Sequence, residues 1–314
     1  MSPMRTICVG VLTLAALQAQ STTRLHDVRV QVLSTMLTDS KGIGEWGFAA
    51  LVEADGRRIL FDTGARPDTV WKNVQEMKVD LSDITDVILS HNHGDHTAGL
   101  LTLRRELAKK NPKALTRAHV GRGAFYERSG NNLLRSIKAD YESTGAAFIE
   151  YDASKQIFPG VWLTGPVKRV HPERNWSGAG KLTRPDGTVA EDNLPEDMSL
   201  VLDTDRGLIV VSGCGHAGII NTLEQARHVV RSAPIHAAIG GWHLFAASDS
   251  TLDWTAGKLK EFGIENFLGA HCTGIEAVYQ IRAKTGLTRR TASVAAVGAE
   301  FTLKNGMQPG TIAK

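Results

Sequence analysis

The chain has 314 residues, of which 42% are hydrophobic and 22% are charged. This ordinary globular composition excludes long-range disorder and fibrous repeats, and it allows one large domain or two small ones. The 36 basic and 33 acidic side chains leave a formal charge of +3, which is too slight to predict nucleic acid or an anionic membrane as the main partner. Three cysteines are too few for a disulfide scaffold.

Residues 1–20 have the layout of a secretory signal peptide. Arg5 precedes an apolar run from Ile7 to Leu17, and small and polar residues follow. This run is shorter than the roughly 20 apolar residues of a transmembrane helix, and the alternatives are a buried helix or a retained anchor. We expect cleavage, and therefore a mature protein that is exported to the periplasm or secreted, with no membrane span.

From Val28 onward, short apolar runs typical of β-strands follow one another. The runs Phe48–Glu53 and Arg58–Phe61 flank an Asp-Gly pair, which predicts a β-hairpin. The other elements expected in this half are strands over Val28–Leu37, Asp86–Leu89 and Ala118–Val120 and helices over Leu100–Lys110 and Gly130–Ala139.

The second half repeats this order of a hairpin followed by helices and single strands. A hairpin is expected over Ser199–Val211, helices over Ile219–Ser232 and Ser250–Phe262, and strands over Ile235–Ile239 and Asn266–Gly269. Two such halves predict an α/β sandwich. Between them, His171–Asp197 is rich in Gly, Pro, Asn and charge, which indicates a long ordered loop or lid.

Histidines cluster directly after the strand predicted for Asp86–Leu89. The sequence SHNHGDHTAG places His91, His93, Asp95 and His96 within six residues. Imidazole and carboxylate groups are suitable ligands for zinc, iron or manganese. His91 and His93 project the same way from an extended turn and can share one ion, while Asp95 and His96 can face a second. A solvated histidine-rich turn is the alternative, but the adjoining buried strand and helix favour a metal site.

Further ligands are expected at the ends of later strands, where α/β folds place their ligand sites. The candidates are His216 in GCGHAG, His271 in GAHCTG and His243 in GGWHL. Cys214 is either a metal-ligating or site-lining residue or a packed side chain, and Cys272 is interpreted as packed. A disulfide in the exported protein is the other alternative for these cysteines. The remaining histidines outside these settings are interpreted as surface or packing residues: His26, His119, His171, His228 and His236.

Together these motifs resemble the metallo-β-lactamase superfamily. The resemblance depends on HxHxDH at residues 91–96, preceded by FDTG at residues 61–64, and it covers residues 27–314. It implies a four-layer αββα sandwich of two similar halves, with a loop or lid insertion around residues 121–197. The segments WGFAALVEADGRRILFDTG, SLVLDTDRGLIVVSGCGHAGIINTLE, GGWHL and GAHCTG are similar to the subfamily that includes the archaeal dihydropterin–aminobenzene-ribofuranosyl-phosphate synthase.

The resemblance assigns roles position by position. It makes His91 and His93 ligands of a first metal, Asp95 and His96 ligands of a second, and His271 the last histidine ligand. Asp62 matches a carboxylate that orients the histidines, so Asp62 and Asp95 are the expected catalytic carboxylates. The implied cofactor is Zn²⁺, as one or two ions, with iron or manganese as alternatives.

The chain departs from the superfamily pattern at two ligands. Glu196, Asp197 and Met198 stand before the second hairpin, where a histidine is usual, and Cys214 stands after it, where a bridging Asp is usual. Cys214 is therefore a candidate replacement for the bridging carboxylate, and His216 for the missing histidine. These changes leave the number and identity of the metal ions open.

The implied reaction is hydrolysis of an ester, lactone, amide or phosphoester by metal-activated hydroxide. The alternatives are a dihydropterin-type transferase that joins its substrates by a C–N or C–C bond with loss of pyrophosphate, and a non-catalytic metal-binding protein. The signal peptide weighs against the transferase, because coenzyme synthesis takes place in the cytosol. The intact HxHxDH motif weighs against a non-catalytic protein.

The expected substrate is a small molecule. It is expected to be anionic if at least two of the basic side chains around the lid face the site. The basic and aromatic residues in question are Arg122, Lys168, Arg169, Arg174, Trp176, Lys181 and Arg184.

Overall fold

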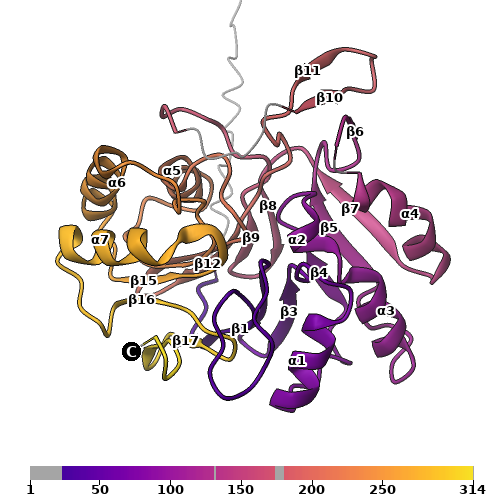
Figure 1. Ribbon diagram of the computed structural model, residues 1–314, viewed down its shortest axis with the longest axis horizontal. Helices are drawn as coiled ribbons and strands as arrows, with labels where there is room; N and C mark the ends of the chain where they lie inside the picture. Colours follow the sequence, from indigo (N-terminus) through magenta and orange to yellow (C-terminus); the bar gives the residue numbers. More distant parts are fainter. Residues whose placement is uncertain (1–22, 131, 174–179, 314) are drawn as a thin grey trace, which may run out of the picture.

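The computed structural model describes residues 23–130, 132–173 and 180–313 (Figure 1). The signal peptide predicted for residues 1–20 lies outside the described residues. Within the described part, no helix combines the length and the apolar character that a membrane span requires.

The first large sheet has eight strands, which come from the first half of the chain and from its C-terminal segment. Its order is β18-β17-β1-β2-β3-β4-β5-β7. The strands are β1 (Val28–Ser34), β2 (Ala49–Ala54), β3 (Arg57–Phe61), β4 (Asp86–Ile88), β5 (Arg117–Gly121), β7 (Ala147–Tyr151), β17 (Glu300–Thr302) and β18 (Gly306–Gln308). The predicted hairpin forms at β2–β3, where Asp55 and Gly56 both have positive φ, of 45° and 79°, as a tight two-residue turn requires.

The second large sheet has seven strands in the order β16-β15-β14-β13-β12-β9-β8. They are β8 (Lys155–Phe158), β9 (Val161–Leu163), β12 (Leu200–Thr204), β13 (Gly207–Ser212), β14 (Ile235–Gly240), β15 (Asn266–Gly269) and β16 (Ala292–Val294). The hairpin predicted over Ser199–Val211 is β12–β13.

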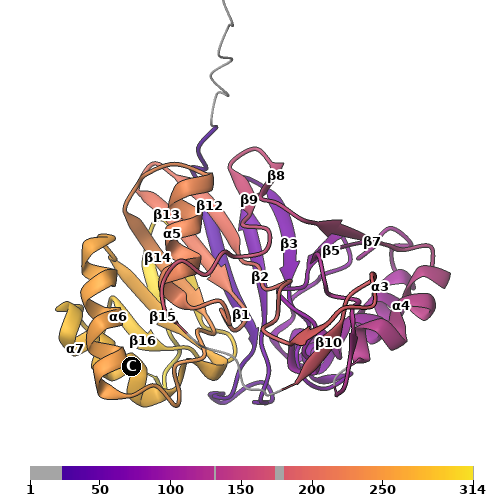
Figure 2. The ribbon, with the colours of Figure 1, turned by 90° about the horizontal axis from the view of Figure 1, so that it is seen from above.

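The two sheets lie face to face between two layers of helices (Figures 1 and 2). Fully buried Phe48, Phe61 and Phe301 belong to the core between the sheets. One outer core joins the first sheet to α1 (Thr69–Met77), α3 (Leu100–Ala108) and α4 (Leu133–Ser143). The other joins the second sheet to α5 (Ile219–Val229), α6 (Asp249–Glu261) and α7 (Ile275–Thr285). The structure is thus the predicted four-layer αββα sandwich of two similar halves.

Residues 121–197, expected to hold a loop or lid insertion, contribute to several parts of the fold. Helix α4 and strand β7 join the first half, and β8 and β9 join the second sheet. Strands β10 (Lys181–Thr183) and β11 (Val189–Glu191) form a hairpin that pairs with β6 (Glu127–Arg128) in a separate three-stranded sheet. Part of the stretch predicted as loop is therefore a β-hairpin that projects beyond the sandwich (Figure 1).

Parallel strands position the candidate site. Strands β3, β4, β5 and β7 run parallel in the first sheet, and β13 to β16 run parallel in the second. The carboxyl ends of parallel strands meet at one sheet edge, which is where α/β folds place ligands. Asp62 follows β3, the histidine motif follows β4, and Cys214, His243 and His271 follow β13, β14 and β15.

Candidate metal centre

The histidine motif begins as a buried turn and ends in α2 (Gly94–Thr97), a single turn of helix whose N-cap residue is His93. His91 and His96 are buried, while His93 and Asp95 are half-buried. The turn is attached to the second half of the chain, because the backbone N–H of Met198 donates to the Ser90 carbonyl at 3.0 Å.

Asp62 is the central acceptor beneath the motif. Its Oδ2 lies 2.7 Å from His96 Nδ1 and 2.8 Å from Ser90 Oγ, and that hydroxyl lies 2.9 Å from His91 Nδ1. Its Oδ1 accepts the Ser90 backbone N–H at 2.7 Å. The Asp62 carboxylate thus binds the Nδ1 side of His96 directly and the Nδ1 side of His91 through the Ser90 hydroxyl. The Nε2 atoms of both imidazoles therefore remain available to a metal.

The first ligand group combines His91, Cys214 and His216, whose ligand atoms all lie within 4.8 Å of one another. His93 lies beside this group, with its ring centroid 4.6 Å from that of His91 and 5.0 Å from that of His216. The structure therefore brings together the predicted first-site histidines and the candidate replacement His216.

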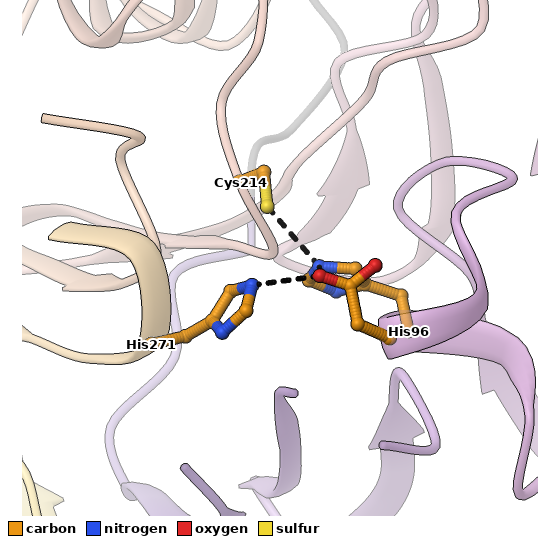
Figure 3. Close-up of side chains that lie close together, drawn as sticks. His96, Cys214 and His271 are labelled. Atoms are coloured by element: carbon orange, nitrogen blue, oxygen red, sulfur yellow. Dashed lines mark hydrogen bonds and ion pairs between the residues drawn. The ribbon is translucent and has the colours of Figure 1, made fainter. Parts of the chain in front are cut away.

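The second ligand group combines Asp95, His96, Cys214 and His271, again within 4.8 Å of one another. His96 Nε2 lies 3.1 Å from Cys214 Sγ, and His271 Nε2 lies 3.1 Å from Asp95 Oδ2 (Figure 3). Cys214 belongs to both groups. Its sulfur therefore has the shared position that the superfamily pattern assigns to a bridging carboxylate.

The backbone of the site is held in an unusual conformation. Asp62, His243 and His271 have φ values of 54°, 48° and 47°. This left-handed region is uncommon for residues other than glycine, and such strain clusters at functional sites. Close packing is a further constraint, because a Cβ on Gly213 would lie 2.1 Å from Ser90 Oγ and 2.5 Å from Asp62 Oδ2.

Burial and neighbouring charges together set the protonation of the site. Burial holds the pKa of His91 well below its usual range and lowers the pKa of His93 to about 4, so both imidazoles are neutral at pH 7, as metal ligands must be. Against the effect of burial, Asp95 and Asp62 raise the pKa of His96, and Cys272 and Asp95 raise the pKa of His271 to about 10, so a metal ion must displace a proton from each of these two imidazoles. Burial opposes ionisation of Asp95, but the neighbouring His96 and His271 hold the pKa of that carboxyl below its usual range. Burial raises the pKa of the Cys214 thiol in the protein without metal.

The donor atoms fit a divalent cation. His91 Nε2 and His271 Nδ1 are buried and have no hydrogen-bond partner among the described residues. A buried polar atom without a partner costs on the order of 1–3 kcal/mol, and a cation bound at His91 Nε2 would remove that cost there. Imidazole, carboxylate and thiolate together are the donor set of zinc.

Comparison with known proteins decides the family. The family model of the metallo-β-lactamase superfamily matches residues 47–190. A 7,8-dihydropterin-6-methyl-4-(β-D-ribofuranosyl)-aminobenzene-5'-phosphate synthase from Methanocaldococcus jannaschii is 30% identical over 240 residues, which are 73% of this chain and 81% of the relative. The chain belongs to the metallo-β-lactamase superfamily.

Solved structures agree with this assignment. The crystal structure of Tm1679, a metal-dependent hydrolase of the β-lactamase superfamily, aligns with a TM-score of 0.70 and 25% identity, over 87% of this chain and 98% of that one. The metallo-β-lactamase fold protein YhfI from Bacillus subtilis aligns with a TM-score of 0.55 and 15% identity, over 87% and 99% of the two chains. Proteins of the metallo-β-lactamase fold usually bind divalent metal, commonly zinc.

Among the basic residues expected to line the site, only Arg169 contacts a site residue in the described part of the chain. Its guanidinium donates to the His216 carbonyl at 2.6 Å and to the Asn193 carbonyl. Arg122 pairs with Asp152 at 3.5 Å, and the side chains of Lys168, Lys181 and Arg184 are exposed. Arg174 and Trp176 lie outside the described residues.

Sequence reasoning missed three residues that support the site. Ser90 links Asp62 to His91, as described above. Asp197, which is buried, accepts the Ala217 N–H at 2.8 Å next to His216, and Glu196 accepts the Asn92 N–H at 3.3 Å within the histidine motif. Ser90 adjoins the motif in the sequence, but nothing in the local pattern places residues 196 and 197 against it, because that contact depends on how the two halves pack.

His243 lies with the two cysteines rather than in either histidine group. Its ligand atom and those of Cys214 and Cys272 lie within 4.8 Å of one another. The five histidines interpreted as surface or packing residues belong to none of the clusters of metal-ligating groups in the described chain: His26, His119, His171, His228 and His236.

Proposed function

We propose that this protein is a metal-dependent hydrolase that acts on an ester, lactone, amide or phosphoester. The observation that carries the proposal is the pair of ligand groups that meet at Cys214, because two adjacent groups of this composition suit a two-ion hydrolytic centre. Divalent ions bound there would lower the pKa of a water molecule and polarise a substrate oxygen.

The chain's own residues prepare this chemistry. Asp62 fixes which ring nitrogen of His91 and His96 faces the centre, so no reorientation is needed when substrate arrives. Asp95 remains ionised beside His271, which keeps its carboxylate available to a metal ion.

The site also has an apolar side, which supports an organic substrate. Trp46 and Phe245 are 48% and 52% exposed, and their rings meet edge to face at 5.6 Å. The ring of Trp46 lies 5.1 Å from that of His271. This surface supports a small organic molecule with an apolar part. Among the described residues only Arg169 of the basic set reaches the site, which is fewer than the two side chains that would favour an anionic substrate. The layout of residues 1–20 supports export to the periplasm or the extracellular medium.

A second candidate function is the transferase reaction with loss of pyrophosphate. The observation that favours it is the 30% identity to the dihydropterin–aminobenzene-phosphate synthase, over 81% of that relative. The two candidates differ in the nucleophile, which is water in one reaction and an arylamine substrate in the other.

A hydrolysis screen with the metal-loaded mature protein tests the proposal. Esters, lactones, β-lactams and phosphoesters are offered alongside a dihydropterin pyrophosphate plus an arylamine, and His91→Ala serves as the matched inactive control. Hydrolysis by the wild type that His91→Ala loses supports the hydrolase. Release of pyrophosphate that requires the arylamine, without hydrolysis of any ester, lactone or phosphoester, would contradict the hydrolase proposal and support the transferase.

A further inference from the structure

Two cysteines and a histidine lie side by side next to the histidine groups. Cys214 Sγ and Cys272 Sγ are 3.2 Å apart, and the backbone N–H of His243 donates to Cys272 Sγ at 3.2 Å. Both cysteines are free and buried. The imidazole of His243 completes a set of three ligand atoms that lie within 4.8 Å of one another.

Three neighbouring parallel strands build this cluster. Cys214 follows β13, His243 follows β14 and Cys272 follows β15, each within three residues of the strand end. The turns approach so closely that a Cβ on Gly241 would lie 1.9 Å from the Gly213 carbonyl oxygen and 3.0 Å from Cys272 Sγ. The strand ends therefore place two sulfurs and an imidazole in one small volume.

Packing alone does not account for this arrangement. A packed cysteine requires neither a second thiol in contact nor a histidine in the left-handed region, yet His243 has a φ of 48°. Moreover, His243 Nδ1 is buried and has no hydrogen-bond partner among the described residues. A positively charged ligand would satisfy that nitrogen and both sulfurs together.

We propose that Cys214, Cys272 and His243 form a further metal position, with Cys214 shared with the histidine groups. Two thiolates and one imidazole are a soft donor set, which selects Zn²⁺ or Cu⁺ over Mn²⁺ or Mg²⁺. Zinc–sulfur bonds of about 2.3 Å place two thiolates of one tetrahedral ion about 3.8 Å apart, so a small opening of the present pair admits the ion. The position is independent of whether the protein hydrolyses its substrate.

Cadmium binding tests this proposal without reference to activity. Cd²⁺ is titrated into the metal-free, reduced protein, and the thiolate-to-cadmium absorption and the ions bound per chain are followed in wild type and in Cys272→Ser. We expect the variant to lose about half of the absorption, because one of two thiolates is gone, and to bind one ion fewer. His243→Ala should also bind one ion fewer, while His236→Gln, which changes a histidine at the other end of β14, should match the wild type.

Two results would overturn the proposal. One is equal thiolate absorption in wild type and Cys272→Ser, and the other is a disulfide between Cys214 and Cys272 in the purified protein, seen as a mass two hydrogens lower. If Cys272→Ser does not fold, cadmium NMR of the wild type decides, since two-thiolate ligation gives a different chemical shift from one-thiolate ligation. Failure of the hydrolase proposal would appear only in the substrate screen and would leave the cadmium result unchanged.

Discussion

At the scale of single residues, Cys214 has the most consequential position in the site. Its sulfur belongs to every group of metal-ligating atoms found in the described chain. A thiolate in the place of a bridging carboxylate would make the centre softer, which would favour zinc over manganese. A metal bound there would stabilise the thiolate, although burial raises the pKa of the free thiol.

Substitution of Cys214 should change the preference for metal. Cys214→Ser should lose zinc, because a neutral hydroxyl replaces a thiolate, whereas Cys214→Asp restores a carboxylate and should bind manganese better than the wild type does. Metal content and turnover of the three proteins, loaded in parallel with zinc and manganese, measure this. Equal zinc occupancy and turnover in wild type and Cys214→Ser would exclude Cys214 as a ligand.

Asp62 supports the ligands without joining either ligand group. Asp62→Asn keeps an oxygen acceptor and tolerates the positive φ of this residue, so the fold should persist. The weaker acceptor should reduce metal affinity by about 10–100-fold, as measured by competition with a coloured chelator. Asp86→Asn is the matched control, because Asp86 is also a buried carboxylate paired with a histidine, His119, but lies away from the ligands. Equal affinity in Asp62→Asn and Asp86→Asn would contradict the role of Asp62.

At the scale of elements, the start of helix α5 depends on a buried carboxylate. Glu173 accepts the backbone N–H groups of Ile220 and Asn221 at 3.1 and 2.8 Å. These are among the N–H groups that a helix start leaves without partners. Burial nevertheless dominates and raises the pKa of Glu173 to about 7 from its ordinary 4.5.

This shift predicts a pH dependence of stability. Because the folded state raises the pKa of Glu173, its contribution to stability is fully present below about pH 4.5 and is lost as pH rises toward 7. Glu173→Gln removes the titration, so the stability of the variant relative to the wild type should increase by about 3 kcal/mol between pH 4.5 and pH 8, at about 1.4 kcal/mol per pKa unit. Urea unfolding of both proteins at the two pH values measures this, and a difference that does not change with pH would refute it.

The sequence patterns predicted the local elements well and their long-range contacts less well. Both hairpins, the strand before the histidine motif and the positions of His216 and His271 at strand ends follow from local apolar runs and turn residues. The sharing of Cys214 among the ligand groups, and the contacts of Asp197 and Glu173, depend on segments that meet only after the two halves pack. Cys272 is buried, as the packed interpretation expects, but its contacts with Cys214 and His243 are not predicted. These partners are distant in the sequence and reach Cys272 only through the parallel order of β13, β14 and β15.

At the scale of the whole molecule, the centre joins the two halves of the sandwich. Asp95 and His96 come from the first half, while Cys214 and His271 come from the second. A hydrogen bond beside these residues also connects the two halves, because the backbone N–H of His271 donates to Thr35 Oγ1 at 2.9 Å. Ions bound here would therefore hold the halves together as well as support catalysis.

Metal removal should consequently lower thermal stability. A ligand at about 100 times its Kd stabilises a folded protein by about 2.7 kcal/mol, so dialysis against a chelator should lower the Tm of the wild type by several degrees, and zinc should restore it. His271→Ala, measured in the same way, should show a much smaller change. A wild-type Tm that does not respond to chelator and zinc would contradict the link between metal and fold.

The central claim is that the two ligand groups that share Cys214 bind metal. Its most direct test is the zinc content of the purified protein, measured by mass spectrometry after equal loading with zinc. The measurement compares the wild type with His91→Ala and Asp95→Ala. His91 belongs to one ligand group and Asp95 to the other, so each substitution removes a ligand from a different group and each should reduce the zinc bound per chain steeply. Zinc content unchanged from the wild type in either variant would contradict the assignment of that group as a metal site.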